Sequence, residues 1–152
     1  MTIKGYKSLE DEHKKLKNND RPNVIKAIAE AREHGDLSEN AEYHAAKELQ
    51  SFIEGRIKEL EYKIARAEVI DISQIKNDKI VFGASVLLYD ENSDKEYTYK
   101  IVGIDEADVE KSLISINSPV ARALMGKEVG EVVSVKTPIG NTSYEILNIE
   151  YV

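Results

Sequence analysis

The chain has 152 residues, 41% of them hydrophobic and 32% charged, which is typical of a soluble globular protein with one domain or two small ones. No run of about twenty apolar residues could span a membrane, and the first residues lack the apolar stretch of a secretory signal, so we expect a cytoplasmic protein. The absence of cysteine excludes disulfides and thiolate metal sites, and the formal net charge of -7 argues against broad wrapping of nucleic acid.

The first part of the chain has helical periodicity. Apolar side chains recur at helical spacing between about Tyr6 and Leu16. The segment 18–22 ends in proline, which is tolerated only in a first helical turn, so we expect a bend or short break there. From Asn23 the helical pattern resumes and continues to Gly35.

A short turn joins this helical run to the next. Gly35 suits the left-handed position that closes a helix, and Asp36 with Glu39 three residues later matches a capping box that opens one. The same carboxylates, about one turn apart on a projecting tip, also suit a hard divalent cation and its bound water. From the local pattern alone, capping is the commoner role, and the surrounding fold must decide.

The second helical run is longer. It extends from about Ser38 to Glu68, a rod of about 45 Å at a rise of ~1.5 Å per residue. Its apolar residues alternate spacings of three and four, as a seam between paired helices requires, at Ala46, Leu49, Ile53, Leu60, Ile64 and Ala67, with Ile57 one place from its ideal position. Because helices joined by so short a turn are antiparallel neighbours, residues 1–75 are expected to form a coiled-coil hairpin with an acidic tip.

Residues 76–152 have the alternating pattern of a second domain. The pattern predicts strands over 80–89, 96–104, 113–117, 131–136 and 143–151, and short helices over 105–111 and 120–125. Turn-rich pieces divide the strands, which favours antiparallel pairing. The expected fold class is α+β with two domains, a helical hairpin followed by a domain dominated by antiparallel strands.

Positive charge that could meet RNA lies on the hairpin. From Ile75 onward there are eight basic and thirteen acidic side chains, so the second domain is an unlikely nucleic-acid platform. The basic candidates on the hairpin are Lys26, Arg32, Lys47 and Arg56, although ion pairing on a helix surface is a commoner role for such residues. No phosphate-binding glycine loop, zinc-ligand spacing or activated nucleophile is present, so we expect no self-sufficient active site.

The tip belongs to a longer segment that resembles a known family. Residues 28–47 read IAEAREHGDLSENAEYHAAK and closely resemble the coiled-coil tip of bacterial Gre-type transcript cleavage factors. Three further stretches are similar to the same family and occur in the same order: GRI at 55–57, VFGA at 81–84, and ISINSPVAR at 114–122 with GK following at 126–127. The resemblance therefore extends over nearly the whole chain.

The resemblance implies a fold and a partner. The expected fold is an N-terminal antiparallel coiled coil with a C-terminal FKBP-like domain, which would dock on RNA polymerase while the coiled coil enters the secondary channel. There Asp36 and Glu39 would help the polymerase hold a weakly bound Mg²⁺ and orient the water that cleaves the 3′ end of backtracked RNA. The protein would then be a monomer without enzyme activity or a stably bound cofactor of its own.

The resemblance also implies roles for residues beside the two acids. Arg32 and Lys47 are candidates to attract the backtracked RNA, whereas Asn40 and Tyr43 would support the tip or touch the RNA.

Other expectations concern the second domain and departures from the family pattern. Docking on the polymerase is expected at Ser118 and Pro119. Ser38 stands where many relatives carry lysine, which lowers the positive charge at the tip. His13 lies where an apolar residue is usual, and we expect a partly buried structural histidine there rather than a catalytic one.

Two other functions remain open at this point. Some relatives enter the same channel and inhibit, so the chain could be an inhibitor or a non-catalytic adaptor in which the acids only cap a helix. An autonomous nuclease is a further alternative. The presence of both Asp36 and Glu39 favours stimulation of cleavage.

Overall fold

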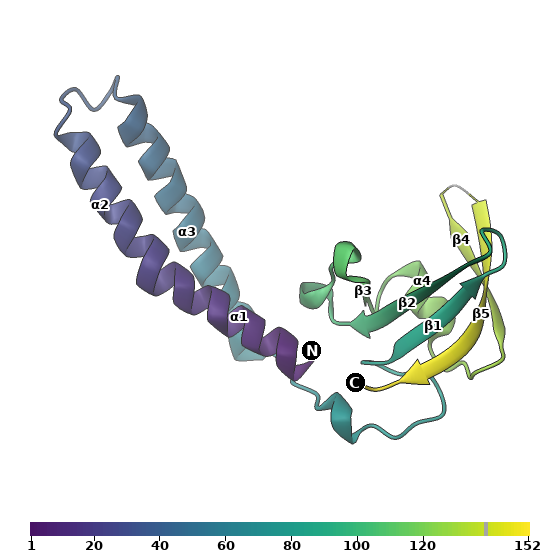
Figure 1. The fold of residues 1–152 in the computed structure, drawn as a ribbon. Helices are drawn as coiled ribbons and strands as arrows, with labels where there is room; N and C mark the ends of the chain where they lie inside the picture. Colours follow the sequence, from purple (N-terminus) through teal and green to yellow (C-terminus); the bar gives the residue numbers. More distant parts are fainter. Residues whose placement is uncertain (139) are drawn as a thin grey trace. The chain divides into compact units, whose positions relative to one another are not determined.

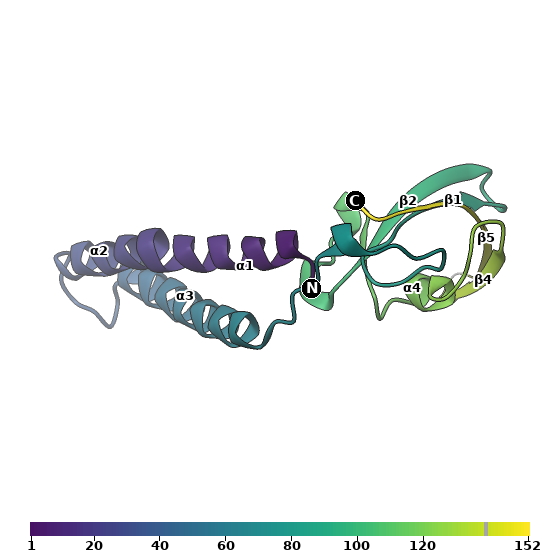
Figure 2. The same ribbon diagram turned by 90° about the horizontal axis from the view of Figure 1, so that it is seen from below.

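The computed structural model describes residues 1–138 and 140–152, which form two compact units. One unit is Tyr6–Glu68, and the other combines Met1–Gly5 with Val69–Val152. Figure 1 and Figure 2 show the first as paired helices and the second as a curved sheet with a short helix. None of the helices in the described ranges has an apolar stretch long enough to cross a bilayer.

The helical unit is an antiparallel hairpin, as predicted. Its first arm contains α1 (Ile3–Lys15), a π-helical turn (Leu16–Asp20) and α2 (Arg21–Arg32), and its second arm is α3 (Ala41–Arg66). Of the bend or short break expected at 18–22, the break is wrong, because the first arm passes through this segment as a continuous helix with a π-helical turn (Figure 2). Pro22 lies in the first turn of α2, directly after the π-helical turn, where a missing backbone N–H is best tolerated.

The π-helical turn keeps the apolar stripe of the first arm on the seam. Leu9 and Leu16 are buried before the turn, and Val24 and Ala31 after it. Leu16 and Val24 are eight residues apart, one more than a heptad, so an uninterrupted α-helix would turn Asn23 towards α3 in place of Val24. The π-helical turn absorbs the extra residue, which is the physical reason for its position.

The seam of α3 has the predicted three and four spacing, but one of its residues was assigned wrongly. Ile53, Ile57 and Leu60 are buried, whereas Leu49 is 52% exposed. The half-buried Gln50 occupies the seam position beside it. Counted from Gln50, Ile57 falls on the ideal spacing, so the apparent irregularity at Ile57 arose from placing Leu49 on the inner face.

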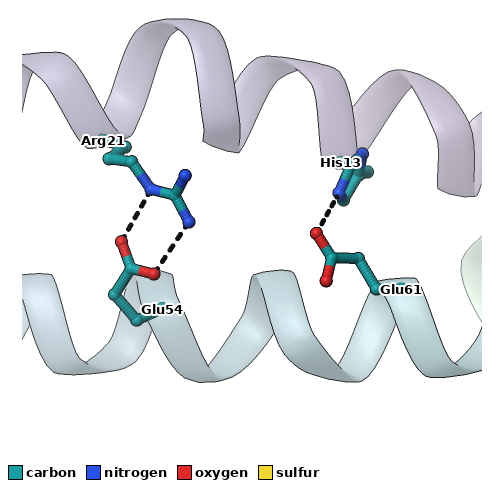
Figure 3. Close-up of polar contacts among 4 residues, drawn as sticks. All are labelled: His13, Arg21, Glu54 and Glu61. Atoms are coloured by element: carbon teal, nitrogen blue, oxygen red, sulfur yellow. Dashed lines mark hydrogen bonds and ion pairs between the residues drawn. The ribbon is translucent and has the colours of Figure 1, made fainter.

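Polar pairs across the hairpin flank this seam (Figure 3). Arg21 binds both carboxylate oxygens of Glu54, with N–O distances of 2.7 and 2.8 Å. His13 Nε2 lies 3.0 Å from Glu61 Oε1, and this hydrogen bond lowers the pKa of Glu61. His13 is partly buried, as predicted. These contacts fix which residues of the two arms face each other.

The other unit is built on a sheet with the strand order β3-β2-β1-β5-β4. Its strands are β1 (Ser85–Asp90), β2 (Lys95–Val102), β3 (Leu113–Ser115), β4 (Val132–Thr137) and β5 (Gly140–Glu150). Neighbouring strands pair antiparallel except β2 and β3, which pair parallel. The prediction of a sheet dominated by antiparallel strands is therefore confirmed.

The connection from β2 to β3 differs from the short helix predicted over 105–111. The structure has 3-10 turns at Ile104–Glu106 and Val109–Lys111. Ala107 between them is extended, and Asp108 forms a β-bridge with Leu113. This bridge holds the middle of the segment in an extended form and prevents a continuous helix.

The core of this unit lies between the sheet and α4 (Pro119–Leu124). Every second residue of β1 is buried, beginning at Val86, which is the alternation expected for a sheet with one covered face. Leu88, Ile101 and Ile146 from three strands and Leu124 from α4 are fully buried in one cluster. Together the hairpin and this unit confirm the predicted α+β fold class.

Candidate functional site at the hairpin tip

The turn between α2 and α3 is set by Gly35 and Asn40. α2 ends at Arg32, and Gly35 has the predicted left-handed backbone, with a φ of 106° that glycine adopts without strain. The side-chain oxygen of Asn40 accepts a hydrogen bond from Tyr43 N at 3.0 Å and caps α3. Its Nδ2 donates to Ala31 O at 2.6 Å, so a single amide group joins the two arms.

The predicted capping box of Asp36 and Glu39 is wrong. Asp36 Oδ1 accepts hydrogen bonds from Ser38 N at 3.1 Å and from Ser38 Oγ at 2.9 Å, which closes a small turn ahead of the helix. α3 starts at Ala41 rather than near Ser38, because Asn40 caps the helix through its side-chain oxygen and is held in place by the bond of its nitrogen to Ala31 O. The acids of the tip are therefore not needed as helix caps.

Asp36 and Glu39 are exposed and border the same hollow. This open hollow has a volume of about 490 Å³ and is lined by His34, Asp36, Glu39, Asn40, Ala41 and Glu42. Among the described residues, the Glu39 carboxylate has no hydrogen-bond or ion-pair partner, and Asp36 is engaged through Oδ1 alone. Both side chains thus keep carboxylate oxygens available to an external ligand.

Glu42 is a third carboxylate at this hollow that the sequence analysis missed. It lies in the first turn of α3, and its Oε2 is 3.6 Å from His34 Nε2. Its position two residues after Asn40 could have pointed to it, since an acid in a first helical turn is favoured by the helix dipole. No group of three or more acidic, histidine or cysteine side chains in the described ranges is placed to hold a metal ion. Metal binding by Asp36 and Glu39 stays a prediction.

Tyr43 and Asn40, the residues expected to support the tip or touch RNA, both make contacts within the tip. The half-buried Tyr43 packs edge-on against His44, with ring centroids 5.6 Å apart. His44 Nε2 lies 3.2 Å from Ser38 O, which ties α3 to the turn. These contacts agree with a supporting role, and contact with RNA stays a prediction.

Two of the four basic candidates on the hairpin are engaged in ion pairs. Arg56 binds both carboxylate oxygens of Glu12, at 2.8 and 3.0 Å, and these hydrogen bonds raise the pKa of Arg56. Lys26 Nζ lies 3.9 Å from Glu30 Oε1, one helical turn away. For these residues the commoner role, ion pairing on a helix surface, is confirmed.

Arg32 and Lys47 lie closer to the tip, and both are exposed. Arg32 is in the last turn of α2, and Lys47 is in the second turn of α3, where its Nζ donates to Gln50 Oε1 at 3.3 Å. Since Gln50 is neutral, this hydrogen bond does not offset the positive charge of Lys47. Attraction of RNA by the two residues stays a prediction.

Ser118 and Pro119 begin α4 in the other unit. Ser118 Oγ accepts a hydrogen bond from Ala121 N at 3.2 Å, and Pro119 occupies the first helical turn. Ser118 is half-buried and Pro119 is exposed. Helix capping accounts for both residue types, and a role in docking stays a prediction.

Each half of the chain matches a family model. The model described as "Transcription elongation factor, N-terminal" matches residues 1–69, and the one described as "Transcription elongation factor, GreA/GreB, C-term" matches residues 75–151.

Individual proteins are similar over the same length. The transcription elongation factor GreA of Thioalkalivibrio sulfidiphilus is 58% identical over 153 residues, which cover 100% of this chain and 97% of that protein. The protein of the same name from Paracoccus denitrificans is 60% identical over 152 residues, with the same two coverages. The solved structure of GreA factor homolog 1 from Thermus thermophilus is 28% identical, covers 99% of this chain and 97% of that one, and has a TM-score of 0.44. The matches of both family models and the identity to full-length relatives show that the chain belongs to the GreA/GreB family of transcription elongation factors.

Proposed function

We propose that this chain is a non-enzymatic cofactor of RNA polymerase, which inserts its helical hairpin into the secondary channel and stimulates the polymerase's own cleavage of backtracked RNA. The observation that carries the proposal is the exposure of Asp36 and Glu39 at the turn of a two-helix rod, with carboxylate oxygens left open to a ligand. Membership of a transcription elongation family supports the choice of partner. The protein acts as one copy, in the cytoplasm.

The tip residues fit a Mg²⁺ ion that is shared with the polymerase. Mg²⁺ prefers oxygen ligands and keeps several waters, so one added carboxylate can raise its occupancy without a complete protein site. Asp36 is the better ligand, because Ser38 fixes one carboxylate oxygen and leaves the other open. When bound, the ion would stabilise charge on the attacking and departing oxygens at the RNA phosphate.

Glu39 suits a different task. Its carboxylate has no partner among the described residues, so it can accept a hydrogen bond from the attacking water and orient that water. Glu39 and Asp36 border the same hollow, which keeps the two tasks close together. The two acids therefore act as a pair and not as interchangeable charges.

The remaining candidates would serve binding. Arg32 and Lys47 are exposed cations near the tip and would attract the phosphates of the backtracked RNA. Asn40 and Tyr43 would hold the turn in shape. The sheet unit would dock on the rim of the channel, with Ser118 and Pro119 at the contact.

The test is RNA cleavage in a purified backtracked elongation complex. The double variant Asp36→Asn with Glu39→Gln keeps the shape of both side chains but removes their charge, and we expect stimulated cleavage to fall by about 10²-fold or more. Glu48→Gln is the matched control, because Glu48 is an exposed acid of α3 that does not border the hollow. Equal cleavage by the double variant and the wild type would refute the proposal.

The alternative is a channel-binding inhibitor or a non-catalytic adaptor, in which the acids serve only the local fold. Asn40 caps α3, so the helix cap that this alternative assigns to Asp36 and Glu39 is already supplied by another residue. It predicts that the wild type slows or fails to stimulate cleavage while still binding polymerase. Stimulation by the wild type excludes it.

A further inference from the structure

The first residues of the chain are built into the sheet unit, although α1 continues into the hairpin. Thr2 is only 4% exposed and forms a parallel β-bridge with Ile70. Ile70 N donates a hydrogen bond to Met1 O at 2.8 Å. The start of the first arm is therefore attached by its backbone to the segment that follows α3.

Glu106 holds the same residues with its side chain. Its Oε1 accepts hydrogen bonds from Thr2 N, at 2.9 Å, and from Thr2 Oγ, and its Oε2 accepts one from Gly103 N at 2.8 Å. Thr2 Oγ in turn accepts a hydrogen bond from Gly5 N at 3.0 Å, in the manner of a helix N-cap. Both oxygens of this carboxylate are thus used to hold the beginning of α1.

Gly5 makes this arrangement sterically possible. A Cβ atom at Gly5 would overlap the carboxylate of Glu106, whereas a Cβ at Gly55 in α3 would have nothing within 4 Å. Glycine is unfavourable inside a helix, so its presence in the first turns of α1 calls for a specific reason. The close approach of Glu106 supplies that reason.

The length of the first arm makes its attachment important. The arm is helical without a break from Ile3 to Arg32, which corresponds to about 45 Å at ~1.5 Å per residue. The turn that carries Asp36 and Glu39 follows the far end of this arm. A displacement of about 1 Å can already reduce a reaction by about 10²-fold.

We propose that Glu106 is a positioning residue, which acts by holding the first turn of α1 and so restrains the arm that leads to Asp36 and Glu39. The inference rests on the proposed function, in which the sheet unit docks and the tip acts at the polymerase active site. Glu106 touches neither RNA nor the reacting atoms and acts only through α1.

The anchoring itself is measured by hydrogen exchange of the backbone amides of Thr2 and Gly5 in the full chain. Glu106→Gln keeps the shape of the side chain, but its amide nitrogen cannot accept a hydrogen bond, so we expect these amides to exchange about 10-fold faster or more. Glu110→Gln is the control, because Glu110 is exposed on the next turn. Unchanged exchange in Glu106→Gln would overturn the proposal.

The consequence for function is measured in backtracked elongation complexes as the maximal cleavage rate and the half-saturating concentration. Gly5→Ala displaces the Glu106 carboxylate while favouring the helix, so a loss of activity cannot come from a weaker helix; Gly55→Ala is its matched control. We expect Gly5→Ala and Glu106→Gln to lower the maximal rate several-fold at an unchanged half-saturating concentration. Thr2→Ser, which keeps the hydroxyl group, should retain the wild-type rate.

The two measurements separate the inference from the proposed function. Wild-type maximal rates in both Gly5→Ala and Glu106→Gln would overturn the positioning role. If the wild type itself stimulates no cleavage, the proposed function fails, and the positioning role for cleavage fails with it. The exchange rates then still decide whether Glu106 anchors α1.

Discussion

The middle of the hairpin and its tip use their side chains in opposite ways. In the middle, Ile57 and Leu60 are 2% and 0% exposed, and charges beside the seam are paired across the two arms. At the tip, Asp36 and Glu39 are exposed, and Glu39 has no partner in the part of the chain that the structure describes. Stability therefore resides in the seam, and the candidate chemistry lies where packing contributes least.

This separation explains how the hairpin tolerates an acidic end. A buried charge without a partner lowers the stability of the fold by several kcal/mol, typically about 3 to 5 when a buried ion pair loses one member. At an exposed turn the same charges are screened by water and salt. The tip can therefore carry exposed carboxylates because Asn40, and not an acid, caps α3 and bonds the end of α2.

The largest effect on stability is expected in the seam. Ile57→Ala should lower the free energy of unfolding by about 2 to 5 kcal/mol, because it leaves a cavity between the two arms. Leu49→Ala, at an exposed position of the same helix, should change it by about 0.5 kcal/mol or less. Denaturant unfolding followed by circular dichroism measures both. If Leu49→Ala lowered the free energy of unfolding as much as Ile57→Ala, Leu49 would belong to the seam and the assignment of Gln50 would be wrong.

A smaller effect is expected at the junction of the arms. Asn40→Ala removes the cap of α3 and the bond to Ala31, so unfolding should become easier by about 0.5 to 2 kcal/mol. Asn40→Asp keeps the accepting oxygen but loses the donor, so its free energy of unfolding should lie between those of the wild type and Asn40→Ala. Thermal unfolding measures the difference. If Asp36→Ala proves more costly than Asn40→Ala, the assignment of the cap to Asn40 is wrong.

Acid should weaken the charged flanks of the hairpin. The hydrogen bond from Lys63, with a second from Arg56, lowers the pKa of Glu59, and the hydrogen bond from His13 lowers that of Glu61. Because folding lowers these pKa values below the ordinary 4.5, the stabilisation is present above pH 4.5 and is lost as the pH falls through the folded values.

The measurement for this prediction is the midpoint of thermal unfolding between pH 7 and pH 3, at low salt. The double variant Glu59→Gln with Glu61→Gln should lose less stability over this range than the wild type. Since both carboxylates are exposed, the difference should be small and should shrink in high salt. An equal loss in the two proteins would show that these pairs do not contribute.

The smallest effect is expected for a deletion within the π-helical turn. Removing Asn18 brings Leu16 and Val24 to heptad spacing, so an ordinary α-helix can then carry the seam, and the cost should be about 1 kcal/mol or less. Removing Ala27 from α2 shortens the step from Val24 to Ala31 from seven residues to six, so the two can no longer both face α3. This deletion should lower the free energy of unfolding much more. Denaturant unfolding compares the two deletions, and a large loss on removing Asn18 would contradict the role given to the turn.

Much of the hairpin could be predicted from the sequence, because two of its signals depend only on local chemistry. Gly35 was expected in the left-handed region and lies there, since few other residues adopt that backbone without strain. The repeat of apolar residues predicted paired helices, and these are present. The alternation over 80–89 likewise predicted a strand, and β1 is present at Ser85–Asp90.

The errors arose where one pattern allowed two registers. Leu49 is more apolar than Gln50, yet the position of Gln50 in the repeat places it in the seam, so spacing outweighs composition. The eight-residue step from Leu16 to Val24 can be read from the sequence. Both a break and a π-helical turn can bring the two residues to the same face, and the sequence does not decide between them. The cap at Asn40 depends on its contact with Ala31, nine residues away, which no local pattern contains.

The central claim is that the tip carboxylates complete a metal site of the polymerase, and a Mg²⁺ titration of cleavage in backtracked complexes tests it most directly. The account predicts that the wild-type chain lowers the Mg²⁺ concentration for half-maximal cleavage by about 10-fold, and that Asp36→Asn abolishes this shift, since Ser38 would hold the single amide oxygen and the amide nitrogen cannot bind the ion. If the wild type and Asp36→Asn give the same Mg²⁺ dependence, the carboxylate does not share the ion and the account is contradicted.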